Sequence, residues 1–179
     1  MFNITSHGLD EAIAKLSKSP TGLAKAIRSA IRRTLRGAKK DAGSKVKARY
    51  TINAGEVIRT IRLQQSGFSG SMTSSGSRNP LKKFHIRPSA RPRRMPPGGV
   101  FAQNVRGQGG AIRRAWLKRS GGVFERIGTS RFPIRQLKGP SSPGMLSSPP
   151  VSGFIVAKMA ERLEINLSHE VGAVLGGFL

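Results

Sequence analysis

Residues 20–50 constrain the fold more than any other part of the chain, because they carry one continuous apolar stripe at helical spacing. The apolar positions recur every three or four residues: Leu23, Ile27, Ile31, Leu35, Ala38, Ala42 and Val46. This spacing predicts an amphipathic helix of roughly seven or eight turns. Ser19 is a suitable N-cap, and Pro20 suits the first helical position. Gly37 and Gly43 are each expected to weaken the helix by up to about 1 kcal/mol.

Most of the remaining surface of this predicted helix is cationic. One basic row runs beside the apolar stripe: Lys25, Arg28, Arg32, Arg36 and Lys39. A second row contains Arg33, Lys40 and Lys47. We interpret Arg28, Arg32 and Arg36 as candidates to lie along a phosphate backbone, where each cation releases counterions on binding. The alternative is that this face points to solvent or pairs with an acidic neighbouring subunit.

The charge of the whole chain favours a polyanionic partner. Its 179 residues contain 32 Lys and Arg against 8 Asp and Glu, for a net charge of +24. Residues 1–150 hold thirty basic and five acidic side chains, whereas residues 151–179 are close to neutral at −1. Solubility alone needs a net charge of only about 2–8 in a small domain. Because an excess this large repels itself, we expect nucleic acid, or a partner packed against it, to bind.

Several shorter elements are expected before residue 100. Leu9, Ile13 and Leu16 suggest a short first helix, and Asn53 and Glu56 have capping-box spacing for another that runs to about Thr60. Residues 68–74 and the segment around residues 81–86 read as strands. Residues 87–99 contain four prolines, so we expect an extended cationic loop there. Four arginines of this loop are candidates for facing DNA: Arg87, Arg91, Arg93 and Arg94.

The second half of the sequence predicts strands followed by a helix. Short apolar runs at 100–102, 112–117, 123–126 and 132–137 are separated by glycine-rich turns, which is typical of antiparallel hairpins. Residues 139–150 read as a linker rich in Pro and Ser, and a second amphipathic helix follows. We therefore predict an α+β fold: a long basic N-terminal helix, a small antiparallel meander sheet and a C-terminal helix. Residues 1–150 would form the basic domain, and 151–179 would pack on it or on a neighbouring subunit.

The sequence offers little for catalysis. The histidines, His7, His85 and His169, are scattered, and no pair of carboxylates has a recognisable catalytic spacing. There is no Cys, which excludes a disulfide or a thiolate zinc site. The glycines of residues 106–111 lack the Lys-Ser/Thr ending of a P-loop and are expected to form a hairpin turn. We expect no enzyme activity, catalytic residue, metal or cofactor, and no secretion signal or membrane span.

The few aromatic residues fall mostly at strand positions, which favours a place in the core over base stacking. No recognition helix, zinc finger or aromatic RNA-binding signature is present. Contact with nucleic acid is therefore expected to be independent of base sequence.

An ordered set of short segments resembles the prophage minor tail protein Z family. The set is VFA at 100–102, GGVFERIG at 121–128, RFPI at 131–134, LKGPS at 137–141 and ML at 145–146. Leu81, Phe84, Ile86 and the basic N-terminal helix also look similar, so the resemblance covers most of residues 20–165. The chain departs from the family pattern mainly at the longer Pro/Arg loop, residues 87–99, and at the Gly/Phe tail, residues 176–179.

The resemblance implies a tail-completion protein of a long-tailed bacteriophage, found in the virion neck or tail and in the host cytoplasm during assembly. Such subunits are small α+β proteins without catalytic residues. They form a homo-oligomeric ring, commonly a hexamer, around the double-stranded DNA channel. Expected partners are the tail terminator, the neck or connector proteins and the tape-measure protein, with no membrane involved. The alternative is a free, sequence-independent nucleic-acid-binding protein.

Overall fold

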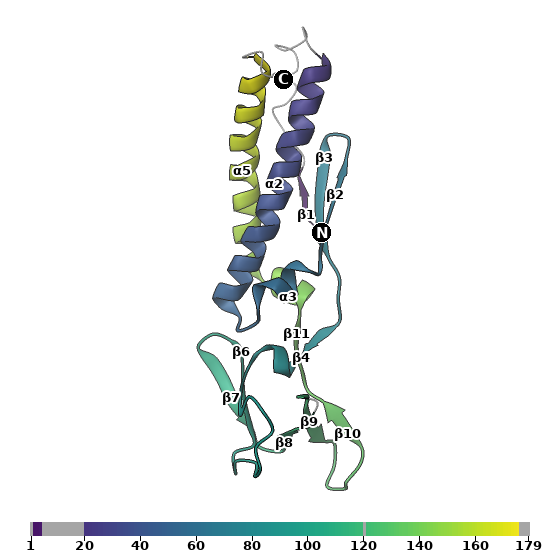
Figure 1. Cartoon of the computed structure of the whole chain (residues 1–179), viewed down its shortest axis with the longest axis vertical. Helices are drawn as coiled ribbons and strands as arrows, with labels where there is room; N and C mark the ends of the chain where they lie inside the picture. Colours follow the sequence, from purple (N-terminus) through teal and green to yellow (C-terminus); the bar gives the residue numbers. More distant parts are fainter. Residues whose placement is uncertain (1, 5–19, 120, 176–179) are drawn as a thin grey trace. The chain divides into compact units, whose positions relative to one another are not determined.

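A computed structural model describes residues 2–4, 20–119 and 121–175, and it confirms the α+β class (Figure 1). The helices are α2 (Pro20–Arg49), α3 (Ala54–Ile58), α4 (Ser142–Leu146) and α5 (Pro149–Leu175), with a 3₁₀ turn at Leu81–Lys83. The first six strands are β1 (Phe2–Ile4), β2 (Ile61–Ser66), β3 (Ser69–Ser74), β4 (Arg78–Pro80), β5 (His85–Arg87) and β6 (Val100–Val105). The others are β7 (Gln108–Ile112), β8 (Ala115–Leu117), β9 (Val123–Arg126), β10 (Ile134–Gln136) and β11 (Lys138–Ser141).

The strands form four small antiparallel sheets where a single meander was predicted. Their strand orders are β1-β3-β2, β5-β6-β7, β10-β9-β8 and β11-β4. The predicted hairpin turn at residues 106–111 joins β6 to β7, with Gly107 at a φ of +79°. A strand that the periodicity missed, β2, pairs with β3 along its whole length. The predicted first helix and the N-cap at Ser19 lie outside the described residues.

The chain forms two compact units that interleave along the sequence. The first unit contains residues 1–42, 61–74 and 149–179, and the second contains residues 43–60 and 75–148. Helix α2 begins at Pro20 in the first unit and ends in the second. Helix α5, which we expected to begin after residue 150, starts at Pro149 and belongs to the first unit.

In the first unit, α5 runs antiparallel to α2 and buries its own apolar stripe (Figure 1). The buried apolar residues of α5 are Val151, Ile155, Met159 and Leu163. The β2–β3 hairpin approaches α2 closely at Gly70, where a Cβ atom would lie 2.7 Å from Ile31 Cγ2. Fully burying side chains of this size stabilises by about 1.5–3 kcal/mol each, so the stripe accounts for the association of these elements.

Three polar contacts set the register of α2 against α5. Arg162 donates two hydrogen bonds to Asp41, of 2.6 and 3.0 Å, and this contact raises the pKa of the guanidinium. Asn166 donates to the buried Thr34 hydroxyl at 3.0 Å. Glu170 Oε1 lies 3.0 Å from Arg33 Nη1 but accepts no hydrogen bond of good geometry, so the contact is an ion pair only. These contacts lie at three successive positions along the two helices. If α5 slid along α2, all three groups would lose their partners, so the contacts favour one register.

Gly37 allows close packing against α5, although glycine is unfavourable inside a helix. A Cβ atom on Gly37 would lie 2.9 Å from Arg162 Cδ, so the missing side chain makes room for the arginine that reaches Asp41. In the second unit, Gly43 similarly makes room for Ile58, whose Cδ1 would lie 2.5 Å from an added Cβ. Any weakening of the helix at these two positions is therefore offset by closer packing.

We expect Asp41 and Arg162 to be coupled in stability. A double-mutant cycle with Asp41→Ala and Arg162→Ala should give a coupling free energy of about 1–2 kcal/mol, because two charge-assisted hydrogen bonds connect the pair. Chemical denaturation followed by the helical circular dichroism signal measures it. The exposed i,i+3 pair Lys158 and Glu161 on α5 serves as the control and should give a coupling below about 0.5 kcal/mol. Additive effects of Asp41→Ala and Arg162→Ala would contradict the proposed register contact.

The second unit builds its core behind the sheet β10-β9-β8. The cluster consists of Leu81, Ile86, Val100, Ala115, Leu117 and Val123. The segment predicted as a linker, residues 139–150, is instead structured: β11 pairs with β4, and α4 buries Met145 and Leu146. The prolines of this segment had indicated a linker. They instead occupy a two-stranded sheet and the first turns of helices, where a missing N–H is tolerated.

Candidate nucleic-acid interface

The arginines predicted to face phosphate fall in both units. Arg28, Arg32 and Arg36 lie one turn apart on an exposed row of α2, in the first unit. Arg87 ends β5, and Arg91, Arg93 and Arg94 lie in the irregular segment 88–99, all in the second unit. All seven side chains are exposed, as an electrostatic interface requires. The first group lies on one helix, whereas the second is divided between the end of β5 and the segment that follows it.

On the α2 row, Arg28 is the arginine whose side chain and backbone both contact the β2–β3 hairpin. Its guanidinium lies 5.7 Å from the centroid of the half-exposed Phe68 ring, at the turn between β2 and β3. The backbone carbonyl of Arg28 also accepts a hydrogen bond of 2.9 Å from Gln65. A cation held against a ring keeps its edge N–H groups available for an anion. The row therefore contains one oriented arginine and two, Arg32 and Arg36, that extend from the helix.

The 88–99 loop begins and ends on ordered backbone. At its start, Arg87 Nε donates to His85 Nε2 at 3.2 Å, and both residues line an open pocket with Lys82, Phe84, Ile86 and Ser89. At its end, Gly99 donates to the Pro96 carbonyl at 2.9 Å and adopts a φ of +76° that favours glycine. Arg91, Arg93 and Arg94 project between these two anchored ends.

Most of the acidic side chains that the structure describes form ion pairs within the chain. Of the six acidic residues that the structure describes, five form ion pairs: Asp41, Glu56, Glu125, Glu161 and Glu170. Glu56 pairs with Lys83 and Arg59, and the hydrogen bond from Lys83 lowers its pKa. The seven candidate arginines appear in none of these ion pairs. Their charge is therefore not neutralised by a carboxylate anywhere in the described part of the chain.

Glu56 also corrects a detail of the predicted cap of α3. Asn53 is the N-cap, because its side chain accepts a hydrogen bond of 3.0 Å from the Gly55 amide. The predicted reciprocal bond from Glu56 back to Asn53 is replaced by ion pairs with Lys83 and Arg59, where two positive charges attract the carboxylate more strongly than one amide does.

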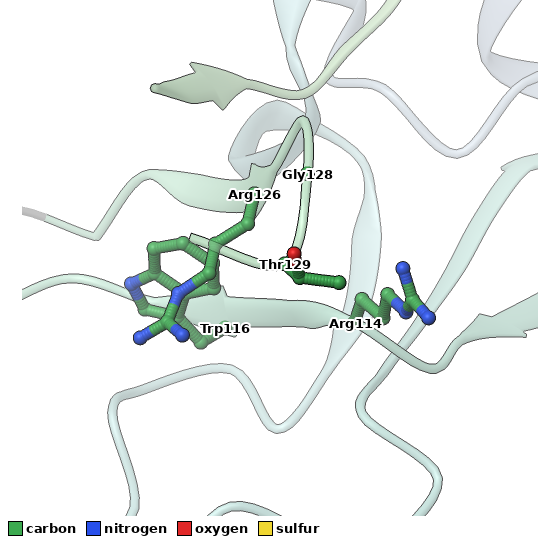
Figure 2. Close-up of a pocket in the computed structure, with 5 residues that line it drawn as sticks. All are labelled: Arg114, Trp116, Arg126, Gly128 and Thr129. Atoms are coloured by element: carbon green, nitrogen blue, oxygen red, sulfur yellow. The ribbon is translucent and has the colours of Figure 1, made fainter. Parts of the chain in front are cut away.

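A further basic site was missed by the sequence reasoning. An open pocket of about 530 Å³ in the second unit is lined by Arg114, Trp116, Arg126, Gly128 and Thr129 (Figure 2). Its aromatic residue was predicted to belong to the core, yet Trp116 is only partly buried. The available signal was the period-2 spacing of Arg114, Trp116 and Lys118, which places all three on one face of a strand.

The comparisons with protein families, curated proteins and solved structures give no match for this chain. None of the described helices is long and apolar enough to cross a membrane. Within residues 2–4, 20–119 and 121–175, no three His, Asp or Glu side chains gather closely enough to hold a metal ion. The chemistry that these residues offer is the binding of anions by exposed guanidinium groups.

Proposed function

We propose that the chain is a structural subunit of a bacteriophage tail or neck, a tail-completion protein. It would assemble as a ring of about six copies at the head-proximal end of the tail, around the DNA channel, and join the tail to the head connector. The subunit would be assembled into particles in the host cytoplasm and would be found in the tail or neck of the virion. The proposal assigns the chain no catalytic step and no cofactor.

The observation that carries this proposal is the unneutralised positive charge. Arginines on α2 and in the 88–99 loop are exposed and have no acidic partner in the described part of the chain. A conduit for DNA needs cations along the phosphate backbone and no reading of bases. The ordered segments at residues 100–146 that resemble the minor tail protein Z family support the same assignment.

The nearly neutral α5 suits a contact with another protein. Its inner side packs on α2, whereas Val156 and Ile165 are 54 % and 60 % exposed. Apolar residues on a helix of low net charge would bring subunits together without adding to the repulsion between their basic parts. Because Val156 and Ile165 are nine residues apart, they lie on opposite flanks of α5, on either side of its outer surface. We therefore assign subunit or tail-terminator contact to these two flanks of α5.

The assembly state tests this proposal. Size-exclusion chromatography with light scattering on the full chain, alone and with the tail terminator of the same phage, should give the mass of a ring of about six subunits or of a stoichiometric complex. Val156→Asp with Ile165→Asp should lower that mass. The matched control, Ala157→Asp with Ser168→Asp, adds the same charge at exposed small residues on the outer surface of α5 between the two flanks and should lower it less. A monomer in both conditions that binds RNA tightly would favour a free nucleic-acid-binding protein instead.

A further inference from the structure

The sheet β10-β9-β8 has two faces of opposite chemistry. Ala115, Leu117 and Val123 point into the core of the second unit. Trp116 and Phe124 are directly opposed on neighbouring strands, so their rings share the other face. Both rings are only partly buried. This outer face, which we call the β8–β9 face, consists of Arg114, Trp116, Lys118, Phe124 and Arg126.

Each aromatic ring of the β8–β9 face makes a cation–π contact with a basic side chain. The Arg126 guanidinium lies 5.9 Å from the centroid of the Trp116 ring, and Lys118 Nζ lies 4.3 Å from that of Phe124. Figure 2 shows the Arg126 side chain against the indole, with Thr129 between this pair and Arg114. A guanidinium that rests on a ring loses part of its rotamer freedom before any ligand arrives, and its edge N–H donors stay available. Less ordering entropy is then lost when an anion binds.

None of the described residues that line the pocket on this face is acidic. The nearest acidic residue in sequence, Glu125, points to the opposite face of the sheet and pairs there with Arg135. Neither Arg114 nor Arg126 forms an ion pair with any residue that the structure describes. The two guanidinium groups lie on either side of Thr129 (Figure 2), and their N–H groups are donors of the kind that phosphate oxygens accept from.

We propose that this pocket binds backbone phosphates of double-stranded DNA. Arg114 and Arg126 contact the phosphate oxygens, and Trp116 is a positioning residue that holds Arg126 in place. The backbone is favoured over single-stranded bases because cations already lie over both rings, and a stacked base would have to displace them. The inference rests on the proposed function, since it names a second place, on the sheet, where the chain contacts the DNA that it surrounds.

The only tryptophan of the chain lies in this pocket, so its fluorescence reports on the site directly. We expect the emission of Trp116 in the full chain to change when a short duplex of random sequence is added, and the change to disappear at high salt. Arg126→Gln and Arg114→Gln should each weaken duplex binding about tenfold near 0.1 M salt and lower the slope of log K against log salt by about 1. Anisotropy of a labelled duplex measures both.

The matched control is Arg135→Gln, which removes the same charge from the other face of the same sheet, where Glu125 already neutralises it. This variant should keep the wild-type slope. Arg126→Lys should recover part of the affinity, and Trp116→Leu should weaken binding whereas Trp116→Phe retains more of it. A merely structural role of Trp116 would lower the unfolding midpoint without separating these two variants in DNA affinity.

Three results would overturn the proposal. The first is duplex binding with unchanged Trp116 emission and unchanged slopes in Arg114→Gln and Arg126→Gln. The second is tighter binding and stronger quenching by a single strand of equal length, which would indicate base stacking. The third is a change in emission with polyglutamate but not with duplex, which would indicate an acidic protein. A monomeric chain whose pocket binds duplex as expected would contradict the ring and leave the pocket standing.

Discussion

Replacing Arg91, Arg93 and Arg94 together with serine is expected to remove most of the affinity for duplex DNA and to leave the fold intact. All three side chains are exposed, so their removal takes no buried contact from the fold. Each lysine or arginine that neutralises a phosphate adds about 0.9 to the salt dependence of log K, so the slope should fall by about 2.7. Near 0.1 M salt, affinity should then fall by a factor on the order of 10² to 10³. Anisotropy titrations of a labelled duplex over a range of salt measure both quantities.

The control for this variant must remove the same charge elsewhere. Arg59→Ser with Arg135→Ser and Lys158→Ser also removes three exposed cations, but each of these is already paired with a carboxylate. The control should lose little affinity, because only the long-range field changes. The proposed tail role adds a second test: in phage particles, the loop variant should still join head to tail, with impaired retention or ejection of DNA. Normal infectivity would contradict a DNA-facing loop, and failure of assembly would indicate a protein partner for it.

Gly99→Ala is expected to destabilise the second unit by about 3 kcal/mol or more. Gly99 ends the 88–99 loop with a φ of +76°, a conformation that costs an alanine about 1–2 kcal/mol. An added Cβ would also lie 2.1 Å from the Ile112 carbonyl oxygen and 2.8 Å from the Arg113 carbonyl carbon. Because both contacts are backbone atoms, β6 and β7 would have to move apart at the register pair Val100 and Ile112.

Gly98→Ala is the neighbouring control, since an added Cβ there meets nothing within 4 Å. Its unfolding free energy should stay within about 0.5 kcal/mol of the wild type. Urea unfolding followed by the emission of Trp116 measures the effect in the unit that contains both glycines. Equal stability of the Gly98→Ala and Gly99→Ala variants would show that this turn does not hold the loop end in place.

Local periodicity predicted the elements whose faces differ strongly in polarity. The apolar stripe from Leu23 to Val46 produced α2 within a residue of its expected bounds, because side chains three or four residues apart must share one side of a helix. Exposure of the loop arginines also followed from composition alone. Residues 139–150 could not be predicted in this way. The pairing of β11 with β4 depends on residues some sixty positions away.

The aromatic residues of the candidate site likewise could not be placed from local sequence. Trp116 and Phe124 fit a core strand by residue type, and only the pairing register puts them on the outer face while Leu117 and Val123 fill the core. A shift of one residue would exchange the two sets. The choice is made by the volume behind the sheet, which Leu81 and Val100 fill from elsewhere in the chain.

Sequence alone determined the long basic helix, the helical C-terminal segment and the surplus of cations, because each depends on the order and charge of neighbouring residues. Tertiary structure decided which cations form ion pairs and which glycines allow a neighbouring element to pack closely, as Gly70 does. It also decided where Arg126 contacts Trp116. Those outcomes depend on contacts between distant segments, and no local pattern in the chain records such distances.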